Sequence, residues 1–480
     1  MDAQRGIARR FVIGLPPEGI GKAWEKDFSA FPPAGVIIFK RDFRDLEDLR
    51  LLTARLRDLA RPRRLFIATD EEGGHVSQLA GHLVVPPNAL LLGRGAEPGD
   101  IEWVSRVTAE RLRALGIDWV FAPVADVHSR ALNPVIGPRA FSTAPGEVAE
   151  RVAEAVRGLR AGGVASCLKH FPGHGDTVLD SHLALPTCTA PRAELAQREL
   201  VPFRANLGAD AVMSAHVVYP ALDAEHPATF SPAVLQNLLR RELGFGGVCI
   251  TDALEMKGAA EGRDTFETGR LALEAGCDLL LFAFHNDELR RVRLELSRAL
   301  VDGKIGRASF DAARPRLARL DGAHRGPSAA ELGKPIGELT PADWESRLER
   351  VVERGLIVRG ALAAPAAGAL WVEEPEWKEG RSLSEELSSL GVPVSANGPA
   401  GLGMVAVASR KPLPAEEIDG LRARCNERPT ILVGLQNDAF LDALPEAALR
   451  ISAADSTPLT RRVVARLLAQ HLKTAARAGV

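Results

Sequence analysis

The stretch GEVAERVAEAVRGLRAGGVASCLKH (146–170) contains the unit from which the fold can be predicted. Its first part, GEVAERVAEAVRGLRAGG (146–163), spaces its apolar residues as one face of a helix does. Its last part, ASCLKH (165–170), is a short apolar run typical of a buried strand. Amphipathic helices that alternate with continuous apolar strands predict βαβ units, whose strands lie parallel and are covered on both faces.

Similar apolar runs recur through the first two-thirds of the chain, with helical patterns between most of them. The other runs are FVIGL (11–15), GVIIF (35–39), LFIATD (65–70), WVFAPVADV (119–127), AVMSAH (211–216), VCITDA (248–253) and LLLFAF (279–284). Eight strands within about 300 residues predict an α/β fold of the closed (β/α)₈ TIM-barrel type rather than an open sheet.

Polar side chains stand at the ends of many of these runs. They are Asp70, Asp126, Lys169, His170, His216 and Asp252, with His285 just beyond the last run. In a parallel barrel such positions converge at the carboxyl ends of the strands, where the active sites of this fold lie. The alternative, that strands simply end where polar loops begin, explains one such residue better than it explains the whole set.

The chain divides into two parts near residue 326. We expect residues 1–325 to form the barrel and residues 326–341 to form a linker, because this segment is rich in Gly and Pro and has no apolar period. Residues 342–480 predict a smaller, sandwich-like open α/β sheet domain. Its predicted strands are ALWVEE (369–374), MVAVAS (404–409), TILVGL (430–435) and LRISAAD (449–455). No glycine-rich phosphate-binding pattern follows these strands, so nucleotide binding is not expected.

Charge and composition argue against several classes of partner. The formal net charge is -2, and no basic run with interleaved aromatic residues occurs, so nucleic acid is not expected as a partner. No segment approaches the roughly 18 apolar residues of a membrane span, and we see no signal peptide before Pro16. The 5 cysteines form no CxxC pair, which is typical of free thiols in a reducing compartment. We therefore expect a cytoplasmic protein, and the sequence leaves its oligomeric state open.

Histidines are concentrated in CLKHFPGHGDTVLDSHLALP (167–186), where a proline and two glycines predict a loop after the fifth strand. One hypothesis is a metal site at His170 and His174, but their spacing places both imidazoles on one face only in a helix. A second is that the histidines bond to loop carbonyls. A third is catalytic, because Asp180 and His182 share a side in an extended segment. The carboxylate can then fix the imidazole as a proton shuttle near neutral pH.

Three further segments carry single candidate residues. Asp252 ends VCITDA, where a carboxylate can reach the barrel mouth as nucleophile, base or ligand; the alternative is that it caps the following helix. Asp70 lies in TDEEGGHVSQL (69–79), where it suits paired sugar hydroxyls unless this is only a polar loop. Arg139 lies in NPVIGPRAFS (133–142) and can fork onto hydroxyls or a carboxylate, although a lone arginine is more often a surface residue.

Together, KHFPGHGDT…DSH, MSAHVVYP, FSPAVLQNLLRRELGFGGVCITDALEM and the upstream DEEGG resemble the bacterial β-N-acetylhexosaminidases of glycoside hydrolase family 3. The resemblance spans roughly residues 10–320, and the first string is its specific part. It implies exo-hydrolysis of terminal β-linked N-acetylglucosamine with retention, and no cofactor or metal. With a cytoplasmic location, it suggests a small carbohydrate substrate from peptidoglycan, such as GlcNAc-anhydro-MurNAc species of muropeptide recycling.

By motif, the resemblance implies Asp252 as the nucleophile and His182 as the acid/base, assisted by Asp180. It also implies that the terminal sugar's hydroxyls are bound by Asp70, Arg139, Lys169 and His170. A neutral-range imidazole then replaces the second carboxylic acid of most retaining glycosidases. The chain departs from the family at His75 and Gln78, where arginines commonly follow DEEGG, which puts one binding contact in doubt. The second domain also looks short, and its role is left open.

Three rival functions stay open at this point. A phosphorylase is the nearest, because a histidine acid/base carries no negative charge that would repel an incoming phosphate. A non-catalytic sugar-binding barrel is the second, although the presence of Asp252 with the Asp180/His182 pair argues against it. A metal-dependent barrel hydrolase is the third, and its activity would be sensitive to a chelator.

Overall fold

The computed structural model describes residues 2–179, 184–284, 288–362, 369–395 and 401–478. The chain forms two compact units. The first consists of Met1–Glu72, Gly99–Ser129 and Thr143–Pro341, and the second of Gly73–Pro98, Arg130–Ser142 and Ala342–Val480. Among the helices of the described ranges, none combines the length and the apolar character that crossing a membrane requires.

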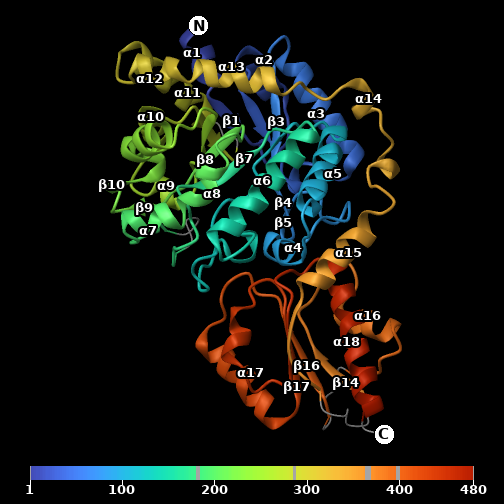
Figure 1. The fold of residues 1–480 in the computed structure, drawn as a ribbon. Coiled ribbons are helices and arrows are strands. Elements are labelled where there is room, and N and C mark those ends of the chain that lie inside the picture. The colour runs from blue at the N-terminus through green and yellow to red at the C-terminus, as the bar shows by residue number, and fades with distance from the viewer. Residues whose placement is uncertain (1, 180–183, 285–287, 363–368, 396–400, 479–480) are drawn as a thin grey trace. The chain divides into compact units, whose positions relative to one another are not determined.

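Eight parallel strands form a barrel in the first unit (Figure 1). They are β1 (Phe11–Ile13), β2 (Gly35–Ile37), β3 (Phe66–Thr69), β6 (Trp119–Val120), β7 (Cys167–Phe171), β8 (Ala211–Ser214), β11 (Val248–Ala253) and β12 (Leu279–Phe282). Their order, β6-β3-β2-β1-β12-β11-β8-β7, follows the chain once around the sheet. Parallel bridges Trp119–Ala165 and Val124–Lys169 join the two end strands. The predicted (β/α)₈ barrel is therefore confirmed.

The interior of the barrel is filled by alternate residues of its strands. The buried cluster contains Phe66 and Ala68, Trp119 and Phe121, Ala165 and Cys167, Ala211 and Met213, Val248 and Ile250, and Leu279 and Leu281. This period of two follows from the pleat of a strand, which turns successive side chains to opposite faces. Because the interior is packed, polar groups that do chemistry have to lie at or beyond the carboxyl ends of the strands.

Helices cover the outside of the barrel (Figure 1). They are α2 (Lys22–Ala30), α3 (Leu46–Ala60), α5 (Asp100–Ala114), α6 (Pro145–Ala161), α8 (Leu200–Ala205), η4 (Ala233–Glu242), α10 (Thr265–Ala275) and α11 (Glu288–Val301). Asp45 caps α3 by accepting the backbone N–H of Asp48. Helices α5 and α6 approach closely because Gly158 has no side chain; a Cβ there would collide with the carbonyl oxygen of Glu102.

Shorter elements connect the strands and cover the amino end of the barrel. They include α1 (Asp2–Ala8), η1 (Lys40–Asp42), β4 (Glu71–Gly73), β5 (Val76–Ser77), η2 (Gly137–Arg139), α7 (Arg192–Gln197), β9 (Val218–Tyr219), β10 (Asp223–Pro227), η3 (Ala228–Phe230), α9 (Lys257–Ala260), α12 (Arg307–Ala312) and α13 (Arg314–Ala323). Leu320 of α13 belongs to the buried barrel cluster. The segment 326–341, expected as a linker, carries α14 (Ala329–Leu332) and η5 (Ile336–Glu338) and groups with the first unit.

The second unit contains a six-stranded sheet in the order β13-β18-β17-β16-β14-β15. Its strands are β13 (Ile357–Gly360), β14 (Leu370–Glu373), β15 (Val394–Ser395), β16 (Gly403–Val407), β17 (Thr430–Gly434) and β18 (Leu449–Ser452). All pairings are parallel except that of β13 with β18. Helix α17 (Ala415–Glu427) covers one face, and α16 (Leu383–Ser389) and α18 (Pro458–Ala478) cover the other (Figure 1). The predicted open α/β sheet domain is confirmed.

Two segments that the sequence analysis assigned to the barrel domain, 73–98 and 130–142, group with the second unit instead. Helix α4 (Ala89–Gly95) packs closely on α15 (Trp344–Gly355), because a Cβ on Gly95 would collide with the carbonyl oxygen of Val351. The Asn88 side chain also donates to the carbonyl oxygen of Ala454 at 2.9 Å. These contacts join residues far apart in sequence, which a boundary drawn from composition does not register.

Candidate active site

Lys169 lies between two carboxylates at the carboxyl end of the barrel. Its Nζ is 2.7 Å from Asp70 Oδ1 and 2.6 Å from Glu72 Oε1, and its side chain is only 3% exposed. Asp70 directly follows β3, and Lys169 belongs to β7, so these two predicted residues are brought together from different strands. The sequence analysis did not select Glu72. Its spacing of two from Asp70 was the available signal, because residues i and i+2 share a side in extended chain.

A second pair joins His170 to the fully buried Asp126. His170 Nδ1 lies 2.6 Å from Asp126 Oδ2, and Asp126 Oδ1 accepts the backbone N–H groups of His170 at 3.1 Å and His174 at 2.6 Å. Burial alone would raise the pKa of Asp126, but His170 and His174 outweigh it and the pKa is lowered. An ionised carboxylate accepts a hydrogen bond from Nδ1–H of the imidazole. Nε2 is then the ring nitrogen that is available to a ligand. Asp126 was noted at a strand end but was not predicted as a site residue.

His174 stabilises the loop after β7. Its Nδ1 lies 2.8 Å from Thr177 Oγ1, and Tyr219 donates to the carbonyl oxygen of the adjacent Gly173 at 2.7 Å. The rings of His170 and His174 meet edge to face with centroids 5.8 Å apart, and each Nδ1 has the partner given above. Within the described ranges, three or more His, Cys, Asp and Glu side chains nowhere gather as a set of metal ligands. This geometry favours the structural hypothesis for His174.

Asp252 lies near the end of β11, and its Oδ1 accepts the backbone N–H of Ala253 at 2.8 Å. Burial alone would raise the pKa of Asp252. Interactions with the imidazoles of His170 and His216, with the Ala253 N–H and with the more distant Lys169 outweigh burial, and the pKa of Asp252 lies below its ordinary value. Asp252 therefore stays ionised at neutral pH. It is not a helix cap, because α9 begins at Lys257 with Met256 as the residue before it.

Two further ionisable groups lie close to Asp252. His216 Nε2 is 3.1 Å from the carbonyl oxygen of Ala253, and its Nδ1 is 2.9 Å from Thr229 Oγ1. Burial lowers the pKa of His216, so this imidazole is neutral at pH 7. Burial raises the pKa of Glu255, and the negative charge of Asp252 adds to that rise. Of these two neighbouring carboxylates, Asp252 thus ionises more easily than an ordinary carboxyl group and Glu255 less easily.

The structure brings Asp70, Lys169, His170 and Asp252 together in the first unit: Lys169 pairs with Asp70, and Lys169 and His170 both lower the pKa of Asp252. Arg139 belongs to the second unit, where its Nη1 donates to the carbonyl oxygen of Val135 at 3.2 Å. His75 and Gln78 also belong to the second unit, and His75 Nδ1 lies 2.9 Å from Asn88 Oδ1. Asp180, His182 and His285 lie outside the described residues.

Known proteins similar to this chain share one family. The model of the glycosyl hydrolase family 3 N terminal domain matches residues 25–320. A beta-hexosaminidase of Neisseria meningitidis serogroup B is 41% identical over 268 residues, which cover 54% of this chain and 73% of that protein. A beta-hexosaminidase of Methylococcus capsulatus is 35% identical over 333 residues, 68% of this chain and 94% of that protein.

A solved structure extends the similarity to both units. It is a glycoside hydrolase family 3 beta-N-acetylglucosaminidase from Paenibacillus sp., with a TM-score of 0.88 and 29% sequence identity. The alignment covers 98% of this chain and 96% of that one. The similarity to this structure therefore includes residues of both the barrel unit and the second unit.

Proposed function

Because the chain belongs to glycosyl hydrolase family 3 and is a glycoside hydrolase, we propose that it is a retaining exo-β-N-acetylglucosaminidase. Its substrates are compounds with a terminal β-linked N-acetylglucosamine. The curated relatives are named beta-hexosaminidases and the solved relative is a beta-N-acetylglucosaminidase, which supports this choice of sugar. The observation that carries the proposal is the partly buried, readily ionised Asp252 beside the paired groups Asp70–Lys169 and His170–Asp126.

In the proposed first step, an Asp252 oxygen attacks the anomeric carbon while the bond to the leaving-group oxygen breaks. His182 gives its proton to that oxygen, and Asp180 stabilises the imidazolium. In the second step, His182 takes a proton from water, the water oxygen attacks the anomeric carbon, and the bond to Asp252 breaks. The sugar leaves with its original configuration because the anomeric centre is inverted twice.

The remaining charged groups bind the terminal sugar in this proposal. The Asp70 carboxylate, oriented by Lys169, accepts hydrogen bonds from hydroxyls, and His170 presents Nε2 to another. Buried charge-assisted bonds of this kind fix the ring over Asp252, which is the positioning that covalent catalysis needs.

The physiological substrate belongs to the same proposal. We infer fragments of peptidoglycan such as GlcNAc-anhydro-MurNAc species, handled in the cytoplasm. The five cysteines are buried and unpaired, which fits a reducing compartment.

Product analysis tests the reaction type. Purified protein is incubated with 4-nitrophenyl β-N-acetylglucosaminide, with and without inorganic phosphate, and the sugar product is identified. Free β-N-acetylglucosamine in both conditions is expected. A sugar phosphate as the main product would show a phosphorylase, and no turnover by folded protein would show a sugar-binding barrel. Loss of activity with a chelator would show a metal-dependent enzyme.

A further inference from the structure

Phe284 exposes an aromatic ring next to the strand that carries Asp252. It lies two residues after β12, which pairs with β11 through Ala253 and Leu281. Phe284 is 50% exposed, although burying a phenylalanine ring is strongly favourable. Of the other large exposed apolar residues of the barrel unit, Leu51 and Val301 lie on the outer helices α3 and α11, and Val178 and Leu179 lie in the loop after β7.

Two backbone hydrogen bonds hold the chain at this ring. Glu255 Oε1 accepts the N–H of Phe284 at 3.0 Å, and Glu255 Oε2 accepts the N–H of Ala283 at 3.2 Å. Because Glu255 follows Asp252 by three residues, the same turn links the proposed nucleophile to the position of the ring. These bonds involve only the backbone of residue 284, so they persist when its side chain is replaced.

A three-layered stack supports the ring from behind. The guanidinium of Arg41 lies 4.4 Å from the ring centroid of Phe284 and 4.2 Å from that of Phe39. Arg41 Nη2 also donates to the carbonyl oxygen of Ala283 at 3.1 Å. A cation between two rings is a stabilising arrangement. The exposed Phe284 ring is thus held rigidly rather than left as a loose surface side chain.

The position of the ring distinguishes it from the groups that bind hydroxyls. Asp70 and Lys169 come from β3 and β7, whereas Phe284 follows β12, which is separated from β3 by β1 and β2. Asp252 stands on β11 next to β12. A flat apolar surface there matches the C–H face of a pyranose ring beyond the bond that is cut.

We propose that Phe284, backed by Arg41 and Phe39, is the platform on which the sugar of the leaving group stacks, so that it selects glycosides with a sugar aglycone. The inference rests on the proposed function. Such binding remote from the reacting bond favours the disaccharide over a glycoside with a small leaving group.

The test compares N,N′-diacetylchitobiose with methyl β-N-acetylglucosaminide. Phe284→Ala lowers kcat/KM for the disaccharide about tenfold, mainly through KM, and changes the methyl glycoside by less than about twofold. Inhibition by free N-acetylglucosamine, which occupies only the terminal-sugar position, is unchanged. Phe284→Trp keeps the preference for the disaccharide, and Phe284→Leu, which keeps apolar volume but has no flat ring, loses most of it. Leu51→Ala, an exposed apolar residue on α3, is the matched control and changes neither substrate.

Equal losses on both substrates would overturn the proposal, because the ring would then only support Asp252 and Glu255. No loss on the disaccharide would overturn it as well. If the wild-type protein cleaves neither compound, the proposed function fails, and calorimetric binding decides the platform separately. If Phe284→Ala binds the disaccharide more weakly than the wild type does but binds N-acetylglucosamine equally well, the platform is supported. If the variant and the wild type bind the disaccharide with equal affinity, the platform is overturned.

Discussion

At the amino end of the barrel, Asp118, Asp210 and Asp278 stand directly before β6, β8 and β12, and all three are buried or nearly so. Each accepts a backbone N–H from the neighbouring strand. The donors are Ile67 at 2.8 Å, Ser166 at 2.9 Å and Cys249 at 2.9 Å. Asp70, Asp126 and Asp252 belong to the carboxyl end of the barrel. Asp70 pairs with Lys169, Asp126 pairs with His170, and Asp252 accepts only the backbone N–H of Ala253 among the described residues.

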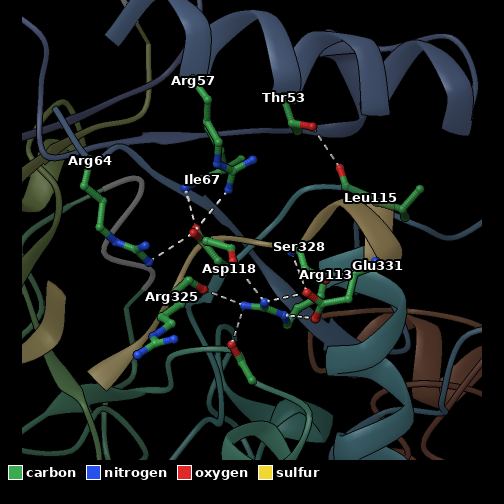
Figure 2. Close-up of polar contacts among 12 residues, drawn as sticks. Thr53, Arg57, Arg64, Ile67, Arg113, Leu115, Asp118, Arg325, Ser328 and Glu331 are labelled. Carbon is green, nitrogen blue, oxygen red and sulfur yellow. Dashed lines mark hydrogen bonds and ion pairs between the residues drawn. The ribbon is translucent and has the colours of Figure 1, made fainter. Parts of the chain in front are cut away.

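The amino-end carboxylates are paired with arginine or histidine side chains. Figure 2 shows Asp118 between Arg57 and Arg64, whose nitrogens lie 3.2 Å and 3.3 Å from Asp118 Oδ2. Asp278 pairs with Arg316 at 2.6 Å in the same way, and His324 Nε2 lies 2.8 Å from Asp210 Oδ1. These partners come from α3, α13 and their flanking loops. Each carboxylate therefore connects a helix or loop outside the barrel to the backbone of a barrel strand.

Arg113 extends this arrangement to the segment after α13. Figure 2 shows it donating to the carbonyl oxygen of Arg325 at 2.8 Å and to the Glu331 carboxylate, with its Nη2 2.8 Å from Oε2. Among the described residues, Asp252 by contrast has one hydrogen bond, from the next backbone N–H. The comparison teaches that an aspartate at a strand end is structural or chemical according to its partners, and not according to its type or its place in the repeat.

Replacing Asp252 gives the largest expected effect on activity. Asp252→Asn lowers kcat by about 10⁴-fold, because the amide cannot form the glycosyl-enzyme bond. The melting temperature changes little, because the amide oxygen still accepts the Ala253 N–H. Steady-state kinetics measures kcat, and thermal unfolding measures the melting temperature. Turnover close to wild type would remove Asp252 from the mechanism.

At the amino end of the barrel, replacing an aspartate is expected to lower stability and to leave kcat unchanged. Asp118→Ala lowers the free energy of unfolding by about 3 kcal/mol, because Arg57, Arg64 and the Ile67 N–H lose a buried acceptor. Urea unfolding measures this, and kcat per folded molecule stays the same. Asp58→Ala, which removes an exposed ion pair with Arg61 on the same helix, is the control and costs less than about 1 kcal/mol. A large loss of kcat in Asp118→Ala without lower stability would contradict the comparison.

A smaller effect, dependent on the leaving group, is expected for His182. His182→Ala lowers kcat/KM for N,N′-diacetylchitobiose about 10²-fold, and lowers kcat/KM for an activated aryl glycoside less than about tenfold. The difference is expected because only the poor leaving group of the disaccharide needs protonation. His324→Ala is the amino-end control, since it removes the partner of Asp210, and lowers stability without changing the ratio of the two substrates. Equal losses on both substrates in His182→Ala would show that His182 is not the acid.

The smallest effect concerns Glu331. The Arg113 hydrogen bond lowers the pKa of Glu331 to about 2, below its ordinary value of 4.5. Because the folded pKa is the lower one, the stabilisation is complete above about pH 4.5 and disappears as the pH falls towards 2. Glu331→Gln therefore lowers the free energy of unfolding by about 1 kcal/mol or less at pH 7, since water screens the half-exposed pair. Urea unfolding at pH 7 and pH 3 should show this difference narrowing at the lower pH; a constant difference would contradict it.

Much of the first unit could be predicted from sequence. Runs such as LFIATD and VCITDA became β3 and β11, and the groups at their ends, Asp70 and Asp252, lie at the expected face. Lys169 and His170 were predicted as sugar binders, and their proximity to Asp70 and Asp252 agrees with a shared site. The interpretation of Asp252 as a helix cap was wrong, because the residues after it form a turn before α9.

Other features depend on contacts between residues that are distant in sequence. Glu72 belongs to the site because it contacts Lys169, and Asp126 belongs to it because it contacts His170. In both pairs the two residues are distant in sequence. No pattern in the sequence predicts the cis peptide bond between Lys169 and His170. The grouping of 73–98 and 130–142 with the second unit likewise depends on close packing of backbones, such as that at Gly95.

The sequence by itself determined the barrel, the second sheet and the strand ends that carry Asp70, Lys169, His170 and Asp252, because apolar period and turn residues act over a few neighbours in the chain. Only the tertiary structure decided which charges meet: Lys169 between Asp70 and Glu72, His170 on Asp126, and Arg41 between Phe39 and Phe284. Closing the barrel fixes the register of all eight strands at once, and that register sets the distances between side chains that no local pattern connects.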